Sequence, residues 1–311
     1  MSRTAFLFPG QGSQSVGMMS ALATASDRVR QTFDEASQVL GYDLWAIAEE
    51  GPEERLGQTQ VTQPALLAAG IATWRAWRER GGPTPDFMAG HSLGEYTALV
   101  AADALDFAVA IGLVAQRGEM MQRATPAGSG AMAAVLGLDD EVLATVCEQA
   151  STDGVVSCAN FNSPGQVVIA GDKAAVDRAC ELATEAGARR AVPLAVSVPS
   201  HCALMAPAAE GMRVALEQAE IRAPRVPVRH NVDTRARTAP DAIRAALVEQ
   251  LYRPVRWADT IRALAADGVS QMAECGPGRV LAGLNRRISR DIDTVALIGA
   301  EAIEQALEKW S

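Results

Sequence analysis

The sequence predicts an α/β protein in which helices cover both faces of a mainly parallel sheet, with a small subdomain inserted into a larger one. Strand-like apolar segments alternate with helical patterns along most of the 311 residues, as in sheets built from β-α units. The order of the elements changes near residue 127 and changes back near residue 197. We therefore expect residues 1–126 and 197–311 to form the large subdomain and residues 127–196 the small one.

The first part of the chain opens with a buried strand at residues 4–8, which Pro9 and Gly10 end. Pro64 at the start and Gly81-Gly82 at the end mark the helix expected at 64–80. The further elements expected here are helices at 26–40, 64–80, 93–104 and 107–123 and a short strand at 87–89.

The small subdomain has the predicted order β-α-β-β-α-β, which is that of a ferredoxin-like fold. Asn162-Ser163-Pro164-Gly165 joins the two middle strands and is typical of a turn. The expected elements are strands at 131–136, 155–160, 166–170 and 190–196 and helices at 139–150 and 173–186.

Beyond the small subdomain the alternation of strands and helices resumes. A loop that contains His201 leads into a helix expected at 207–219, and Gly276-Pro277-Gly278 forms a later turn. The other elements expected here are strands at 226–232, 269–274 and 294–298 and helices at 241–251, 257–267, 279–288 and 301–309.

Gly90-His91-Ser92-Leu93-Gly94 lies between the strand at 87–89 and the helix that follows it. Strand, sharp turn and helix is the context in which Gly-x-Ser-x-Gly forms a nucleophile elbow, so the large subdomain is predicted to be α/β-hydrolase-like. The serine hydroxyl would then stand at a helix N-terminus, where free N–H groups favour a developing negative charge. A glycine-rich turn with an incidental serine is the simpler alternative.

An activated serine needs a base within hydrogen-bond reach, and the sequence offers His91, His201 and His230. The side chain of His91 would diverge from the serine at so sharp a turn. His201 follows Ser92 in the chain order of α/β-hydrolases and is the first candidate. His230 ends a predicted strand and could equally be a surface residue. No third member of a triad is recognisable, so either a carboxylate such as Asp233 or a main-chain carbonyl orients the imidazole.

Arg117 stands in a helical segment that is otherwise rich in apolar side chains. A buried arginine typically pairs with an acid, and Glu119 is near in sequence, although not at helical pairing spacing. The alternative is an arginine kept in a pocket to grip a substrate carboxylate with its planar guanidinium.

Composition and charge restrict the partners of the protein. The net charge of −9 produces a field that repels nucleic acid and anionic membrane surfaces. An acidic protein partner would need a local basic patch, for which Arg189-Arg190 and Arg286-Arg287 are the candidates. Five scattered cysteines without CxxC spacing predict reduced thiols and no structural metal. No signal peptide or membrane-spanning run is recognisable, so a cytoplasmic location is expected.

Several motifs together resemble those of one enzyme family, the bacterial malonyl-CoA:acyl-carrier-protein transacylases of type II fatty acid synthesis. These motifs, in the order expected for the family, are residues 8–14, 90–96, 116–118, 160–166, 199–201 and 276–278. Several long motifs in one order are far more specific than any one of them. A departure is His230, because similar proteins often carry Asn there.

The resemblance implies a role for each candidate residue. Ser92 would be acylated by malonyl-CoA, with His201 as the base. The main-chain N–H groups of Gln11 and Leu93 would form the oxyanion hole, and Arg117 would hold the malonyl carboxylate.

The resemblance also implies that a main-chain carbonyl orients the catalytic imidazole, and we expect it near Gln250. The malonyl group would pass to the phosphopantetheine thiol of acyl carrier protein by ping-pong kinetics, which supplies fatty acid elongation. The two arginine pairs become the candidate docking site for this acidic carrier. No cofactor is expected, and the chain would act as a monomer.

A serine esterase or thioesterase that uses the same Ser-His pair is the alternative function. A catalytically idle carrier-binding module is a second alternative.

Overall fold

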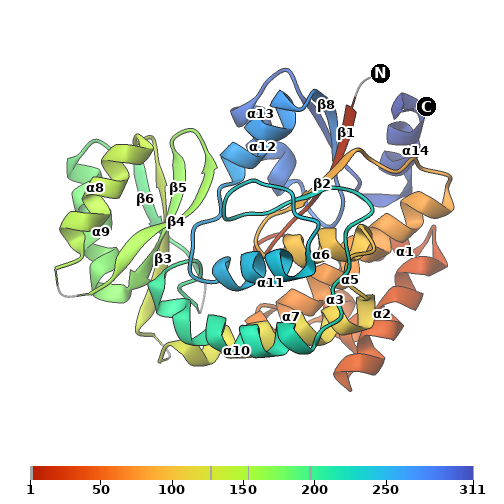
Figure 1. Ribbon diagram of the computed structural model, residues 1–311, viewed down its shortest axis with the longest axis horizontal. Coiled ribbons are helices and arrows are strands. Elements are labelled where there is room, and N and C mark those ends of the chain that lie inside the picture. The colour runs from red at the N-terminus through yellow and green to blue at the C-terminus, as the bar shows by residue number, and fades with distance from the viewer. Residues whose placement is uncertain (1–2, 127, 153, 196–197, 311) are drawn as a thin grey trace.

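The structure is a computed structural model that describes residues 3–126, 128–152, 154–195 and 198–310. Its larger sheet has the strand order β7-β2-β1-β8-β9, and neighbouring strands are parallel. Strands β1, β2 and β8 of this sheet are labelled in Figure 1. In that order the strands are Val228–Arg229, Phe87–Gly90, Arg3–Phe8, Val269–Glu274 and Asp293–Ala296.

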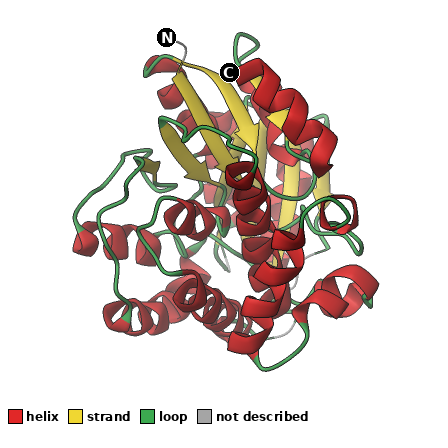
Figure 2. Ribbon diagram, turned by 90° about the vertical axis from the view of Figure 1, so that its right-hand side faces the viewer, coloured by secondary structure: helices red, strands yellow, loops and turns green. Residues whose placement is uncertain are grey.

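Helices cover both faces of this sheet (Figure 2). Phe6 of β1 belongs to the core that includes α5 and α7, whereas its neighbour Leu7 belongs to the core that includes α12 and α13. Both side chains are fully buried, as expected for a parallel strand between two helical layers. The helices of the described residues are α1 (Ser20–Ala23), α2 (Asp27–Leu40), α3 (Leu44–Glu50), α4 (Glu53–Leu56), α5 (Thr59–Glu79), α6 (Gly94–Ala101), α7 (Phe107–Ala124), α8 (Asp140–Ala150), α9 (Lys173–Glu185), the 3-10 helix η1 (Ala203–Met205), α10 (Ala206–Gln218), α11 (Pro240–Glu249), α12 (Trp257–Ala266), α13 (Val280–Ile288) and α14 (Gly299–Trp310).

The second sheet is antiparallel and has the order β4-β5-β3-β6, with α8 and α9 packed against it around a core of its own. Its strands, in chain order, are β3 (Gly130–Leu136), β4 (Val156–Ser163), β5 (Gln166–Asp172) and β6 (Arg190–Pro193). The predicted α/β fold with an inserted β-α-β-β-α-β unit is therefore confirmed. The proposed boundaries at residues 127 and 196 lie outside the described residues, so the division at those positions stays a prediction.

Main-chain hydrogen bonds join the small sheet to the large subdomain. The N–H of Val255 donates to the carbonyl of Ala159 at 2.8 Å, and the N–H of Phe161 donates to the carbonyl of Val255 at 2.9 Å. These bonds tie β4 to the loop that precedes α12. Because both partners are main chain, the relative position of the two sheets depends little on side-chain rotamers.

Several predicted elements differ from the observed ones at their ends: the strand expected at 190–196 ends at Pro193, for example, and the helix expected at 93–104 ends at Ala101. Two differences have a clear physical reason. The helix expected from residue 64 begins at Thr59 and contains Pro64, because tertiary burial of Thr62 and Gln63 outweighs the hydrogen bond that proline loses. The strand expected at 226–232 is paired only at Val228–Arg229, because the chain then leaves the sheet in a turn.

No helix of the described residues is both long and apolar enough to cross a bilayer. The cysteines, which the sequence predicts to be reduced, are free thiols.

Candidate active site

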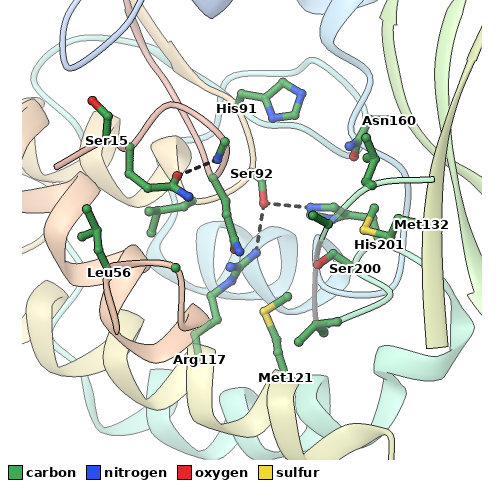
Figure 3. A pocket seen from close by; sticks show the side chains of 18 of the residues that line it. Ser15, Leu56, His91, Ser92, Arg117, Met121, Met132, Asn160, Ser200 and His201 are labelled. Atoms are coloured by element: carbon green, nitrogen blue, oxygen red, sulfur yellow. Dashed lines mark hydrogen bonds between the residues drawn. The ribbon is translucent and has the colours of Figure 1, made fainter. Parts of the chain in front are cut away.

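A cavity of about 420 Å³ lies where the carboxyl ends of β1 and β2 meet the small sheet (Figure 3). Loops after parallel strands gather at one edge of a sheet, which is where α/β proteins bind ligands. Its lining comes from both subdomains and includes Gln11, His91, Ser92, Leu93, Arg117, Met132, Asn160, Leu194 and His201.

Ser92 has the left-handed backbone conformation of a nucleophile elbow, with φ of 51°. The flanking glycines are required by packing. A Cβ atom on Gly90 would lie 1.8 Å from the main chain of Gly94, and one on Gly94 would lie 2.0 Å from the carbonyl oxygen of Phe8. The turn can therefore form only with glycine at both positions.

His201 faces Ser92 from the segment that follows the small subdomain. Its Nε2 lies 2.7 Å from Ser92 Oγ (Figure 3). Its Nδ1–H donates to the main-chain carbonyl of Gln250 at 2.7 Å. This second bond leaves Nε2 free to accept the serine proton. Burial, and after it the charge of Arg117, lower the pKa of His201 from 6.5 to about 3. The imidazole is therefore neutral at pH 7 and ready to act as a proton acceptor.

Arg117 projects from α7 into the same cavity and is almost fully buried. Its guanidinium donates to Gln63 Oε1 at 2.9 Å, to Gln250 Oε1 at 2.9 Å and to Ser92 Oγ at 3.3 Å. No carboxylate of the described residues forms an ion pair with it, and Glu119 pairs with Arg123 instead. The interpretation of Arg117 as the partner of a nearby acid is wrong. Burial lowers the pKa of Arg117, as expected for a cation without a direct counter-ion.

The main-chain N–H groups of Gln11 and Leu93 are the predicted oxyanion hole. Both residues line the cavity, and neither N–H donates a hydrogen bond to a described residue. Leu93 precedes the first turn of α6, where the helix dipole favours negative charge. The N–H of Ser92 itself is engaged, because it donates to Asn231 Oδ1 at 2.7 Å.

The other candidates for base and for third triad member are bonded to other partners. The Nε2 of His91 lies 2.8 Å from Asn162 Oδ1, away from the serine. The interpretation of His230 as a surface residue is wrong: it is fully buried and bonded to Glu95. The hypothesis that Asp233 orients the catalytic imidazole is also wrong, because Asp233 pairs with Arg237.

Sequence reasoning missed four polar side chains that surround the reacting groups. They are Gln63, Glu95, Asn231 and the side-chain amide of Gln250. Glu95 had a detectable signal, since a carboxylate three residues after the serine falls on an apolar helix. Gln63, Asn231 and Gln250 had no such signal, because nothing in the sequence around them indicates that they contact the elbow.

The predicted arginine pairs come together at the surface where β4 and β5 meet α13. Arg189, Arg190 and Arg287 line one pocket with residues 163–166, and Arg287 donates to Gln166 Oε1 at 2.6 Å. Arg286 and Arg287 line a second pocket with Arg290. None of the ion pairs among the described residues includes any of these arginines. The patch is therefore a group of arginines without direct ion pairs on an acidic protein.

An elbow serine that touches a neutral, main-chain-oriented imidazole is the arrangement of enzymes that carry acyl groups on a serine ester. Residues 5–306 match the family model described as acyl transferase domain. The malonyl CoA-acyl carrier protein transacylase of Escherichia coli (strain K12) is 54% identical over 99% of this chain and 100% of its own length. The chain belongs to this family of malonyl CoA-acyl carrier protein transacylases.

Solved structures agree with the sequence comparison. An acyl carrier protein S-malonyltransferase from Vibrio cholerae O1 biovar eltor is 54% identical, with a TM-score of 0.96 over 98% of this chain and 100% of that chain. A complex described as PlMCAT:AntF (holo), a type II PKS acyl-carrier protein with its malonyl-transacylase, has a TM-score of 0.98. It is 55% identical and covers 99% of this chain and 100% of that chain.

The lowered pKa of His201 predicts an unusual pH dependence for reaction at Ser92. A small sulfonyl fluoride should modify the serine at a nearly constant rate as the pH falls to about 5, where a base with the ordinary pKa of about 6.5 would be about 97% protonated. In Arg117→Ala the acid limb of the rate–pH profile should move to higher pH, because the positive charge that helps to lower the pKa of His201 is removed.

The measurement is the second-order rate constant of inactivation against pH, with circular dichroism at each pH to confirm that the protein stays folded. An acid limb centred near pH 6.5 in the unmodified protein would contradict the proposed environment of His201.

Proposed function

We propose that this chain transfers the malonyl group of malonyl-CoA to the phosphopantetheine thiol of acyl carrier protein through an ester on Ser92. The chain would act as a cytoplasmic monomer in fatty acid elongation and needs no cofactor. The observation that carries the proposal is the contact of Ser92 Oγ with both His201 Nε2 and the buried guanidinium of Arg117. One oxygen is thus next to a base and next to a site for a carboxylate.

In the first half-reaction, Ser92 Oγ attacks the thioester carbonyl while its proton passes to His201 Nε2. The negative charge that develops on the carbonyl oxygen is stabilised by the N–H groups of Gln11 and Leu93. Each such preorganised donor lowers the barrier by about 3–4 kcal/mol. When the C–S bond breaks, the CoA thiolate takes the proton from the imidazole.

In the second half-reaction the carrier thiol replaces CoA. It gives its proton to His201 and attacks the ester carbonyl, and the released Ser92 oxygen then recovers the proton. The same base and the same oxyanion donors serve both steps, since the second step is the first in reverse with another thiol. The kinetics are therefore expected to be ping-pong.

Arg117 would bind the free carboxylate of the malonyl group. A buried cation that is bonded only to neutral groups is costly, and a substrate anion compensates it. The planar guanidinium matches a carboxylate in two parallel hydrogen bonds, which also orients the acyl group toward the serine.

The arginine patch formed by Arg189, Arg190, Arg286 and Arg287 would dock the carrier. Its unpaired positive charges suit an acidic protein, and the complex of a similar transacylase with an acyl-carrier protein supports such a partner. Arg190 is the first residue of β6 and Arg189 precedes it, and the chain continues from this strand to Leu194 at the cavity. A carrier docked on the patch would therefore have a short path for its phosphopantetheine arm.

Two measurements test the proposed function. Mass spectrometry after mixing with malonyl-CoA should show a malonyl adduct on the Ser92 peptide, and addition of holo-carrier should transfer it. The absence of an adduct would favour an idle carrier-binding module. Release of free malonate as the main product with the carrier present would favour a thioesterase.

Replacing Arg117 by alanine should lower kcat/KM for malonyl-CoA by roughly 10²–10³-fold, equivalent to the loss of about 3–4 kcal/mol from a buried charge pair. Acetyl-CoA, which has no free carboxylate, should be affected much less. The control is Arg123→Ala, which removes an exposed arginine from the same helix. Equal losses for the two thioesters would refute the role of Arg117.

Charge reversal in the arginine patch, by Arg190→Glu or Arg287→Glu, should raise KM for the carrier without changing the reaction with malonyl-CoA. The reason is loss of long-range attraction to an acidic partner, so the difference should shrink at high salt. Arg30→Glu makes the same charge change on the exposed face of α2 and serves as the control. An unchanged carrier KM would mean that docking occurs on another surface.

A further inference from the structure

Glu95 is a fully buried carboxylate in the first turn of α6, three residues after Ser92. Its Oε1 accepts from His230 Nδ1 at 2.7 Å, and its Oε2 accepts from the N–H of Asn231 at 2.9 Å and from Gln250 Nε2 at 3.0 Å. Burial of a carboxylate is unfavourable without such donors, and three of them converge here. Glu95 itself does not line the cavity. Its contacts therefore act on the site only through its partners.

The first of these partners holds the nucleophile elbow. Asn231 Oδ1 accepts from the N–H of Ser92 at 2.7 Å, and Asn231 Nδ2 donates to the carbonyl of Gly90 at 2.7 Å. The side chain thus bonds to the main chain on both sides of His91. Because Ser92 holds a left-handed conformation that non-glycine residues avoid, it persists only where its surroundings fix it. Glu95 fixes Asn231 by accepting its main-chain N–H.

The second partner connects the nucleophile to the arginine. Gln250 Nε2 donates to the carbonyl of Ser92 at 3.0 Å as well as to Glu95, and Gln250 Oε1 accepts from Arg117 at 2.9 Å. Both main-chain groups of Ser92 are therefore held by amide side chains, and the two residues that carry them each donate a hydrogen bond to Glu95, Asn231 from its main chain and Gln250 from its side chain. Gln250 is also the residue whose main-chain carbonyl orients His201.

The carboxylate of Glu95 and the carbonyl of Ser92 together determine which end of the Gln250 amide meets Arg117. A carboxylate and a carbonyl accept hydrogen bonds, so the NH₂ end faces them and the oxygen faces the guanidinium. Without the acceptor at position 95 the NH₂ end would keep only the carbonyl of Ser92, so the amide would be held less firmly. The guanidinium would then lose part of what fixes its position.

We propose that Glu95 is a positioning residue for acyl transfer, whose buried carboxylate holds Asn231 and Gln250 and through them fixes Ser92 and Arg117. The inference rests on the proposed roles of Ser92 and Arg117. It adds that selectivity for a carboxylated acyl group depends on a residue that does not contact the substrate.

The test is the ratio of kcat/KM for acylation of Ser92 by malonyl-CoA and by acetyl-CoA. Glu95→Met keeps the side-chain length and removes both acceptors. The ratio should fall by roughly 10–100-fold, mainly through a higher KM for malonyl-CoA, because the displaced guanidinium matters only to the carboxylated substrate. Glu95→Gln should retain most of the ratio, because its amide oxygen can still accept from the N–H of Asn231 and from Gln250 Nε2.

The matched control is Glu274→Met. Glu274 is also a fully buried glutamate, and it accepts main-chain hydrogen bonds from Leu281 and Ala282 at the start of α13, away from the elbow. Its replacement should lower Tm without changing the ratio. A merely structural role for Glu95 would give this same result, so an unchanged ratio in Glu95→Met would overturn the proposal.

Gln250→Ala keeps the test decisive if Glu95→Met fails to fold, because it removes the amide and leaves the main-chain carbonyl for His201. It should reproduce the fall in the ratio, and a ratio equal to that of the unmodified protein would overturn the proposal. Where both variants fold, the double variant should have the ratio of Gln250→Ala alone, because Glu95 acts on Arg117 through that amide. Additive losses would contradict this route.

The outcome also separates this inference from the proposed function. If the unmodified protein forms no malonyl adduct on Ser92, the proposed function fails. If the adduct forms and Arg117→Ala abolishes the preference for malonyl-CoA, while the variants of Glu95 and Gln250 keep it, only the positioning role is refuted.

Discussion

The site depends on one hydrogen bond, between Ser92 Oγ and His201 Nε2, which joins residues 109 positions apart. Both residues have left-handed backbone, with φ of 51° and 63°, so neither segment would hold its conformation in isolation. The large parallel sheet fixes Ser92 through the close glycine contacts of the elbow. His201 lies in the segment that follows the small subdomain, and main-chain hydrogen bonds of Val255 tie the sheet of that subdomain to the large one. The two-subdomain architecture is thus the means by which base and nucleophile meet.

Burial favours the neutral form of every ionisable group around this bond. His201 is neutral because it is buried and close to a cation, and Arg117 is a cation held by neutral amides. Glu95 is the buried carboxyl group of this network, and Gln250 bonds both to it and to the arginine. An amide suits that position, since its two ends match an anion on one side and a cation on the other. The polar groups therefore form a connected network that links Arg117 through Gln250 to Glu95, although Arg117 Nε has no hydrogen-bond partner among the described residues.

Much of this arrangement is predictable from local sequence, because the elbow depends on glycines that are neighbours of the serine and on a strand and helix that flank it. The ferredoxin-like order is likewise a matter of local periodicity. The network behind the elbow is not predictable in this way. Gln250 reaches the carbonyl of Ser92 across 158 residues, and nothing in its own helix indicates that contact. His230 was misjudged for the same reason, since its burial depends on Glu95 from another element.

The charge of Arg117 has a consequence for selectivity under the proposed function. It is the second cause, after burial, that lowers the pKa of His201, so the free site holds a weak base. A carboxylate bound to the guanidinium would offset that charge and strengthen the imidazole as a proton acceptor. An acyl group without a carboxylate would leave the base weak. Arg117 would then favour carboxylated substrates in two ways: it binds the carboxylate, and the bound carboxylate in turn makes His201 a stronger base. The same dependence disfavours hydrolysis of substrates that lack a carboxylate, because water in the cavity would meet only the weak base.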